Sequence, residues 1–313
     1  RCPEDLKDYD SVMDFEKNLL NSVKEKNTLV FLREIASSTD FQISNQIDRI
    51  IQHAIRDNRF EMYYQPIYEI NTRQYVSAEA LIRLKDDTFG FISPAIFIPA
   101  AEKTGAIHEI GDFVLENVIS FISENNLEQY GIDYIELNLS VAQCIESNLS
   151  EKVMDLLKKY TVSPDKINLE ITETAAAHTP DMLLKNMNRL VKEGIELSLD
   201  DYGSGYSNMS YLLNLPFKMV KIDKYIVWSA FENKKAELAL KATLEMIKKI
   251  GMTVLAEGVE TEEQKKWLIK MGCDYLQGFY FAKGLPKDEF LELMLSQNNK
   301  KKAKDSEEEL ESI

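Results

Sequence analysis

Short apolar segments alternate with amphipathic segments along most of the chain. The strand-like segments cover residues 60–70, 75–84, 132–140, 166–173, 195–201, 218–223, 252–258 and 273–280. Segments with helical apolar spacing separate most of them, at residues 110–126, 141–160, 181–193, 234–250, 261–271 and 287–296. Eight strands alternating with helices predict an α/β fold with a mainly parallel sheet, closed into a TIM-like (β/α)8 barrel.

The first two strands break the rule of helical connections. Only residues 71–74 separate them, whereas a parallel crossover needs a dozen or more residues. The sequence therefore predicts that the first strand of the barrel runs antiparallel to the others.

Both ends of the chain depart from the alternating pattern. Residues 1–40 contain a helical and a strand-like segment that do not join it, so we expect the tail of an upstream domain or a linker. An amphipathic helix at 42–60 opens the barrel domain, which we place at 41–297. Residues 298–313 carry a lysine run followed by an acidic run and predict a disordered charged tail.

Composition narrows the classes of partner and compartment. The net charge of −15 over 313 residues argues against binding a nucleic-acid polymer, and a phosphate-bearing ligand would need a cation to mediate contact. The three cysteines lack metal-ligand spacing, which favours a reduced, cytoplasmic chain. No apolar run approaches the ~18 residues of a membrane span. Because the chain does not begin with Met, we expect a fragment whose membrane anchor, if any, lies upstream.

Polar residues stand near the carboxyl end of almost every predicted strand, where barrels carry their chemistry. Taken singly, each has an ordinary explanation, such as a helix cap, a solvated strand edge or a surface lysine. Their recurrence at one end of successive strands favours a shared site instead. They are Gln65, Glu79, Arg83, Asn138, Glu170, Glu173, Asp200, Asp201, Lys221, Asp223, Glu257, Glu260 and Gln277.

The ligand chemistry of this set indicates hard divalent cations. Carboxylate and amide oxygens suit Mg²⁺ or Mn²⁺, and the three histidines are too isolated for a zinc site. Several acids with one lysine indicate a two-metal site for phosphoryl transfer. Asp200 and Asp201 would diverge on an ideal strand, but a backbone turn at the strand end would let both reach metal. A glycosidase using two carboxylates is an alternative that explains the amide and the lysine less well.

Ordered motifs across residues 45–297 resemble the EAL domain family, which takes its name from the triplet Glu79-Ala80-Leu81. The other blocks follow in order: YYQPI, FIPAAEKTGAI, NLS, LEITET, LDDYGSGYSNMSYL, KIDK, AEGVET and GCDYLQGFYFAKGLP. The resemblance implies a β/α barrel with an antiparallel first strand. It also implies hydrolysis of cyclic di-GMP to linear pGpG with two Mg²⁺ or Mn²⁺ ions, in bacterial second-messenger signalling. We expect Ca²⁺ to bind without supporting turnover, because its looser coordination misplaces the attacking water.

The resemblance also implies a role for each motif residue. The metal ligands are Glu79, Asn138, Glu170 and Asp200 at one ion and Asp201 at the second. Lys221 resembles the catalytic lysine beside the attacking water, and Glu257 resembles an acid of the metal site. Gln277 resembles a residue that holds water or substrate. Gln65 and Arg83 resemble substrate contacts. Glu173 resembles the glutamate that steadies the loop after the paired aspartates.

The same family contains degenerate members that only bind the nucleotide or a protein. Every motif residue is intact here, so we expect an enzyme, with a catalytically weak cyclic di-GMP receptor or scaffold as the alternative. The resemblance further implies a homodimer and an upstream sensory domain. Residues 1–40 weakly resemble the end of a GGDEF domain, and a helical linker from another sensor would fit them equally well.

Overall fold

The computed structural model describes residues 39–177, 181–204 and 209–311, and these form two compact units. Unit 1 contains residues 39–61 and 83–107, and unit 2 contains residues 62–82 together with the described residues from 108 onward. The helix and strand predicted within residues 1–38 lie outside the described residues.

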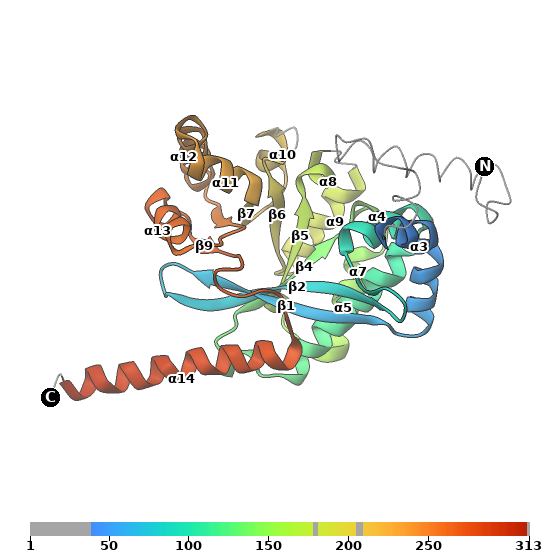
Figure 1. Cartoon of the computed structure of the whole chain (residues 1–313), viewed down its shortest axis with the longest axis horizontal. Helices are drawn as coiled ribbons and strands as arrows, with labels where there is room; N and C mark the ends of the chain where they lie inside the picture. Colours follow the sequence, from blue (N-terminus) through green and yellow to red (C-terminus); the bar gives the residue numbers. More distant parts are fainter. Residues whose placement is uncertain (1–38, 178–180, 205–208, 312–313) are drawn as a thin grey trace. The chain divides into compact units, whose positions relative to one another are not determined.

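Unit 2 is built around a closed barrel of eight strands (Figure 1). Around the barrel the order is β1, β2, β4, β5, β6, β7, β8 and β9, with β9 pairing back to β1. Neighbours from β2 to β9 pair in parallel, whereas β1 pairs antiparallel with β9. The predicted barrel and its antiparallel first strand are confirmed. The strands are β1 Phe60–Glu69, β2 Gln74–Asp86, β4 Tyr134–Leu139, β5 Ile167–Thr172, β6 Glu196–Tyr202, β7 Met219–Ile222, β8 Thr253–Ala256 and β9 Tyr275–Leu276.

Helices follow the strands of unit 2 along the chain (Figure 1). They are α5 Ile107–Glu124, α6 Val141–Cys144, α7 Leu149–Tyr160, α8 Glu173–Ala177, α9 Asp181–Lys192, α10 Met209–Asn214, α11 Lys224–Glu232, α12 Lys234–Lys249, α13 Glu262–Met271 and α14 Lys287–Glu311, with 3-10 turns at Leu127–Tyr130 and Pro164–Lys166. The single helix expected at 141–160 is in fact two helices, α6 and α7, which residues 145–148 separate.

The last helix is longer than the sequence pattern predicts. Disorder was expected from Asn298, whereas α14 continues to Glu311. Lys, Glu and Ala are good helix formers, and neither Gly nor Pro interrupts residues 298–311. A two-residue strand, β10 Leu285–Pro286, precedes this helix and pairs antiparallel with β1. Within the described residues, no helix is both long and apolar enough to cross a membrane.

Unit 1 contains two helices and a short hairpin. The predicted amphipathic helix is confirmed as α3 Thr39–Arg56, which buries the isoleucines at 43, 47, 50 and 51. β3 Gly90–Ile92 pairs antiparallel with the end of β2. α4 Pro94–Thr104 starts behind a Ser93 cap and ends at Gly105, whose φ of 81° favours glycine.

Strand alternation decides which side chains line the barrel. On β5, Ile167, Leu169 and Ile171 join the hydrophobic core that includes residues of the surrounding helices. Asn168 and Glu170 alternate with them, so these two point to the opposite face and into the barrel. Both are nevertheless buried, which places polar groups inside the fold where they need partners.

Candidate active site

The predicted site residues of unit 2 come from almost every strand of the barrel. Glu79 lies on β2, Asn138 on β4 and Glu170 on β5. Register pairs Asn138 with Glu170 and places Asp200 of β6 beside Thr172. The remaining residues are Gln65 on β1, Asp201 on β6, Lys221 on β7, and Glu257 and Gln277 directly after β8 and β9.

Lys221 is the centre of this cluster and is completely buried. Its Nζ donates a hydrogen bond to Glu170 Oε1 at 2.5 Å. Carboxylate oxygens of four further side chains lie within 3.7 Å of the same ammonium, namely Glu257 at 3.2 Å, Glu79 at 3.4 Å, Glu136 at 3.6 Å and Asp200 at 3.7 Å. The reading of Lys221 as a surface lysine is therefore wrong.

Glu79 is held by two amides. Its Oε1 accepts a hydrogen bond from Asn138 Nδ2 at 2.8 Å, and its Oε2 accepts one from Gln277 Nε2 at 2.7 Å. Gln277 also donates to Gln65 Oε1 at 3.3 Å, and Gln65 donates to the carbonyl of Ala282 at 3.1 Å. Four side chains from distant parts of the chain, together with the carbonyl of Ala282, are thus connected in one hydrogen-bond network.

The adjacent aspartates meet because the backbone bends between them. Asp201 has a φ of 56°, a left-handed conformation that is uncommon for a residue other than glycine. The pairing of β6 with β7 shifts register between Leu199 and Tyr202. Together these features let Asp200, Asp201 and Glu257 bring one carboxylate oxygen each within 4.8 Å of one another. The predicted backbone turn at the strand end is confirmed.

Burial and mutual repulsion shift the pKa values of these groups. Burial lowers the pKa of Lys221, but Asp200, Glu170 and Glu79 outweigh it and hold that pKa well above its ordinary value. Burial raises the pKa of Glu170 and of Glu257 well above the usual range. The pKa of Asp201 rises to about 6, first through burial and then through the neighbouring Asp200.

Glu79 differs from the other acids of the cluster. Burial raises its pKa, but Lys221 and the amides of Gln277 and Asn138 lower it further, so the net pKa lies below the ordinary value. Glu79 therefore favours its ionised form, in contrast to Glu170, Glu257 and Asp201, whose pKa values are raised.

Glu173 anchors the backbone after the paired aspartates. It is the first residue of α8 rather than a residue of the fourth predicted strand, and it is buried. Its Oε2 accepts a hydrogen bond from the backbone N–H of Gly203 at 2.7 Å, so the predicted contact with the loop backbone is present. Gly203 has a φ of 97°, and a Cβ there would lie 2.9 Å from Ile226, so glycine is required. Residues 205–208 of the predicted loop lie outside the described residues.

Three of the polar residues predicted near the strand ends are not among the described side chains that contact Lys221 or Glu79. Asp223 is the N-cap of α11 and accepts from the backbone N–H of Tyr225 at 2.9 Å, so the cap explanation holds for it. Glu260 is exposed. Arg83 lies on the part of β2 that belongs to unit 1. The NLS motif has a double use, since Ser140 caps α6 while Asn138 binds Glu79.

Glu136 is not among the predicted site residues. This residue of β4 is fully buried and lies 3.6 Å from Lys221 Nζ. Its spacing was the available signal, because a glutamate two residues before Asn138 shares its face of the strand. Burial raises the pKa of Glu136, although the neighbouring Glu170 and Lys221 lower it.

The donor set fits divalent cations. It consists of carboxylate and amide oxygens, which hard ions such as Mg²⁺ and Mn²⁺ prefer. Among the described residues, Asp200 Oδ1 and Glu170 Oε2 are buried and have no hydrogen-bond partner. Buried carboxylate oxygens without a donor are costly unless a cation satisfies them. The chain therefore presents an acidic cluster suited to metal binding.

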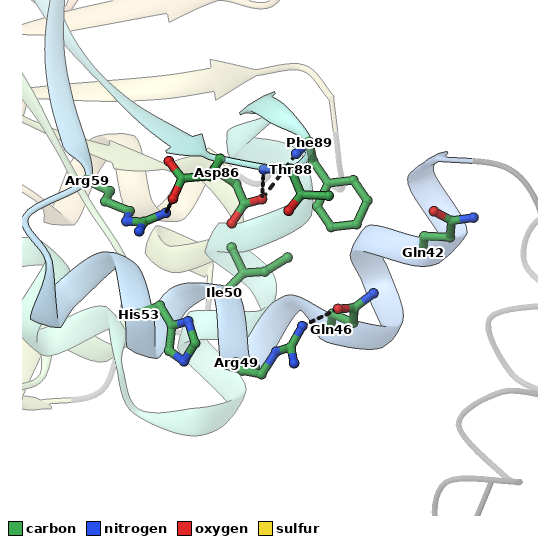
Figure 2. Close-up of a pocket in the computed structure, with 10 residues that line it drawn as sticks. Gln42, Gln46, Arg49, Ile50, His53, Arg59, Asp86, Thr88 and Phe89 are labelled. Carbon is green, nitrogen blue, oxygen red and sulfur yellow. Dashed lines mark hydrogen bonds and ion pairs between the residues drawn. The ribbon is translucent and has the colours of Figure 1, made fainter. Parts of the chain in front are cut away.

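A separate hollow in unit 1 has different chemistry. It has a volume of about 370 Å³ and lies between one face of α3 and residues 86–89 (Figure 2). Several of its charged side chains interact with close neighbours. Arg59 forms an ion pair with Asp87, and Arg49 donates a hydrogen bond to Gln46. Asp86 accepts hydrogen bonds from the backbone N–H groups of Thr88 and Phe89. None of the predicted site residues lines this hollow.

Comparison with known sequences identifies the fold family. A sequence model of the EAL domain matches residues 48–284. The chain is 34% identical over 241 residues to the probable cyclic di-GMP phosphodiesterase PdeB of Escherichia coli, covering 77% of this chain and 46% of PdeB. It is 32% identical over 250 residues to the signaling protein YkoW of Bacillus subtilis, covering 80% of this chain and 31% of YkoW.

Solved structures give the same result. A structure titled PaMucR phosphodiesterase in complex with c-di-GMP is 30% identical with a TM-score of 0.74, and the match covers 78% of this chain and 99% of that one. An EAL domain protein from Listeria monocytogenes is also 30% identical, with a TM-score of 0.69, covering 78% and 95% of the two chains. The chain spans about a third of the length of the first curated relatives it matches, at 30–32%.

Proposed function

Because the chain belongs to the EAL domain family, we propose that it hydrolyses cyclic di-GMP to linear pGpG with the aid of two Mg²⁺ or Mn²⁺ ions. The observation that carries the proposal is the buried Lys221 ammonium among five carboxylates contributed by strands of the barrel or by residues directly after them. PdeB and the c-di-GMP complex of MucR support the choice of substrate.

In this proposal the metal ligands are Glu79, Asn138, Glu170, Asp200 and Asp201. The unpartnered oxygens of Glu170 and Asp200 support it, as does the approach of Asp201 to Asp200 and Glu257. When bound, the two ions lower the pKa of a water and offset charge on the phosphoryl oxygens.

The chain's own residues position and stabilise the reacting groups. Lys221 places a fixed positive charge beside the phosphoryl group and the attacking water, where negative charge develops. Gln277 and Asn138 orient Glu79 through its two oxygens, so that its direction is set before substrate arrives. Gln65, Arg83 and Gln277 are the proposed substrate contacts, with Arg83 at a phosphate. Glu257 is the remaining acid of the metal site.

One experiment separates this function from the receptor alternative. The protein is incubated with cyclic di-GMP and Mg²⁺ or Mn²⁺, and the products are separated by chromatography. Accumulation of pGpG, abolished by EDTA and by Glu79→Gln, supports the enzyme. Binding of cyclic di-GMP without product supports the receptor, and turnover that survives exhaustive chelation contradicts the metal-dependent mechanism.

The molecular context of this domain is also a proposal. We propose a cytoplasmic homodimer that receives its signal from an upstream sensory or GGDEF-like domain. Light scattering of the purified protein tests the dimer, because a monomeric mass across the working concentration range contradicts it.

A further inference from the structure

Glu136 has no role in the site so far, yet it faces the site's central lysine. β4 places it two residues before Asn138, so both side chains lie on the same face of the strand. Successive residues on one face are about 6.6 Å apart along a strand, so Glu136 lies one step closer to the amino ends of the strands. In the strand register Glu136 pairs with Glu79 of β2, so its carboxylate approaches Lys221 at the level of Glu79 and one step below Asn138 and Glu170.

The contacts of Glu136 are incomplete. Its side chain is fully buried, and within the described part of the chain neither Oε1 nor Oε2 accepts a hydrogen bond from a nitrogen or a hydroxyl, although the carboxyl of Glu170 is an interacting neighbour. The nearest cation is the ammonium of Lys221, at 3.6 Å from Oε2. A buried acceptor that lies slightly too far from a donor lowers the stability of the fold, unless a small rearrangement completes the hydrogen bond.

The proposed function supplies that rearrangement. At present Lys221 donates to Glu170 Oε1. Glu170 is a proposed metal ligand, as are Glu79 and Asp200, and Glu257 belongs to the same acidic group. Metal binding would draw these four acids toward the ions, and Lys221 would need another acceptor in the buried interior.

We propose that Glu136 is a positioning residue that holds the ammonium of Lys221 in place once the other four carboxylates serve the metals. Glu136 supplies an oxygen acceptor from the buried side, so that the lysine points at the reacting phosphoryl group. This inference rests on the proposed function, and it extends that function by one residue that does not touch substrate or metal.

The test compares Glu136→Met, which removes the acceptor, with Glu136→Gln, which keeps an oxygen acceptor. Misplacement of a catalytic group by about 1 Å can cost as much as 100-fold, so we expect Glu136→Met to lower kcat between about 10-fold and 100-fold. We expect KM for cyclic di-GMP and the affinity for Mn²⁺ to change less than about threefold, because Glu136 contacts neither. Glu136→Gln should recover most of kcat. Glu196→Met, at an exposed glutamate of β6, is the matched control.

A second measurement does not depend on turnover. Urea unfolding is measured in excess Mn²⁺, the state in which Glu136 is proposed to hold Lys221, for wild type, Glu136→Met, Lys221→Met and the double variant. With Lys221 present, Glu136→Met removes an acceptor near its ammonium; without Lys221, the same change removes an unpartnered buried acid. Glu136→Met should therefore lower the unfolding midpoint, or leave it unchanged, when Lys221 is present. The same substitution should raise the midpoint in the Lys221→Met background.

The outcomes separate the two proposals. Lack of pGpG from the wild type contradicts the proposed function, and the urea cycle then decides the role of Glu136. Equal midpoint shifts in both backgrounds overturn the inference. It is also overturned if Glu136→Met keeps wild-type kcat, or if it loses Mn²⁺ affinity in proportion to kcat, which would make Glu136 part of the metal site.

Discussion

Replacing Lys221 with Met should separate metal binding from catalysis. Lys221 is buried, and its Nζ lies 3.4 Å from Glu79 Oε2. At an effective dielectric constant of about 20, one such pair is worth about 5 kcal/mol before desolvation is subtracted. Breaking a buried ion pair from one side costs about 3–5 kcal/mol net, because the remaining charge is left uncompensated. We expect Lys221→Met to lose that much free energy of unfolding in EDTA.

Divalent metal should reverse part of the loss, because ions can neutralise the acids that Lys221 neutralises in the metal-free protein. A ligand at 100 times its Kd stabilises by about 2.7 kcal/mol. We expect Mn²⁺ affinity to be retained or increased in Lys221→Met, while kcat falls by about 100-fold or more through loss of the fixed positive charge.

Three measurements examine this prediction: urea unfolding with and without Mn²⁺, calorimetric titration of Mn²⁺, and turnover of cyclic di-GMP. Lys218→Met, at an exposed lysine just before β7, is the control and should match wild type in all three. Glu79→Gln should behave differently, losing Mn²⁺ affinity and turnover together. Equal loss of Mn²⁺ affinity in Lys221→Met and Glu79→Gln would refute the separate roles, as would unchanged stability of Lys221→Met in EDTA.

Three further predictions concern pH, the loop anchor and the choice of metal. Since the pKa of Asp201 is raised to about 6, the folded protein holds a proton there that the unfolded chain releases earlier, so metal-free stability should fall as pH rises from about 4 to 6. Release of this one proton should raise Mn²⁺ affinity over that range by up to about tenfold per pH unit, and calorimetry showing a flat profile would contradict the reasoning. Glu173→Gln weakens the acceptor for the Gly203 N–H, so turnover should drop sharply while cyclic di-GMP still binds, and limited proteolysis should cut the following loop faster; wild-type turnover at all Mg²⁺ concentrations would exclude an anchoring role. Ca²⁺ should compete with Mn²⁺ in calorimetry yet yield little pGpG, and turnover in Ca²⁺ equal to that in Mg²⁺ would disprove the geometric argument.

The sequence alone determines the barrel and the chemical character of its open end. Alternation of strands and helices requires a parallel sheet, and the four-residue connection after β1 requires an antiparallel first strand, because a parallel crossover cannot be that short. Period-two spacing likewise places Glu170 opposite the core-facing Leu169, since successive side chains alternate between the faces of a strand.

Only the tertiary structure decides which of these polar side chains meet, and through which atoms. Asp223 and Lys221 share a strand end in the sequence, yet one caps a helix and the other is buried among carboxylates. Asp201 reaches the site because its backbone adopts a positive φ, and Glu136 reaches Lys221 because β4 and β7 belong to the same closed barrel. Local patterns specify the face on which a side chain lies, whereas strand register and backbone bends depend on contacts between residues far apart in the chain, and these set the distances that chemistry requires.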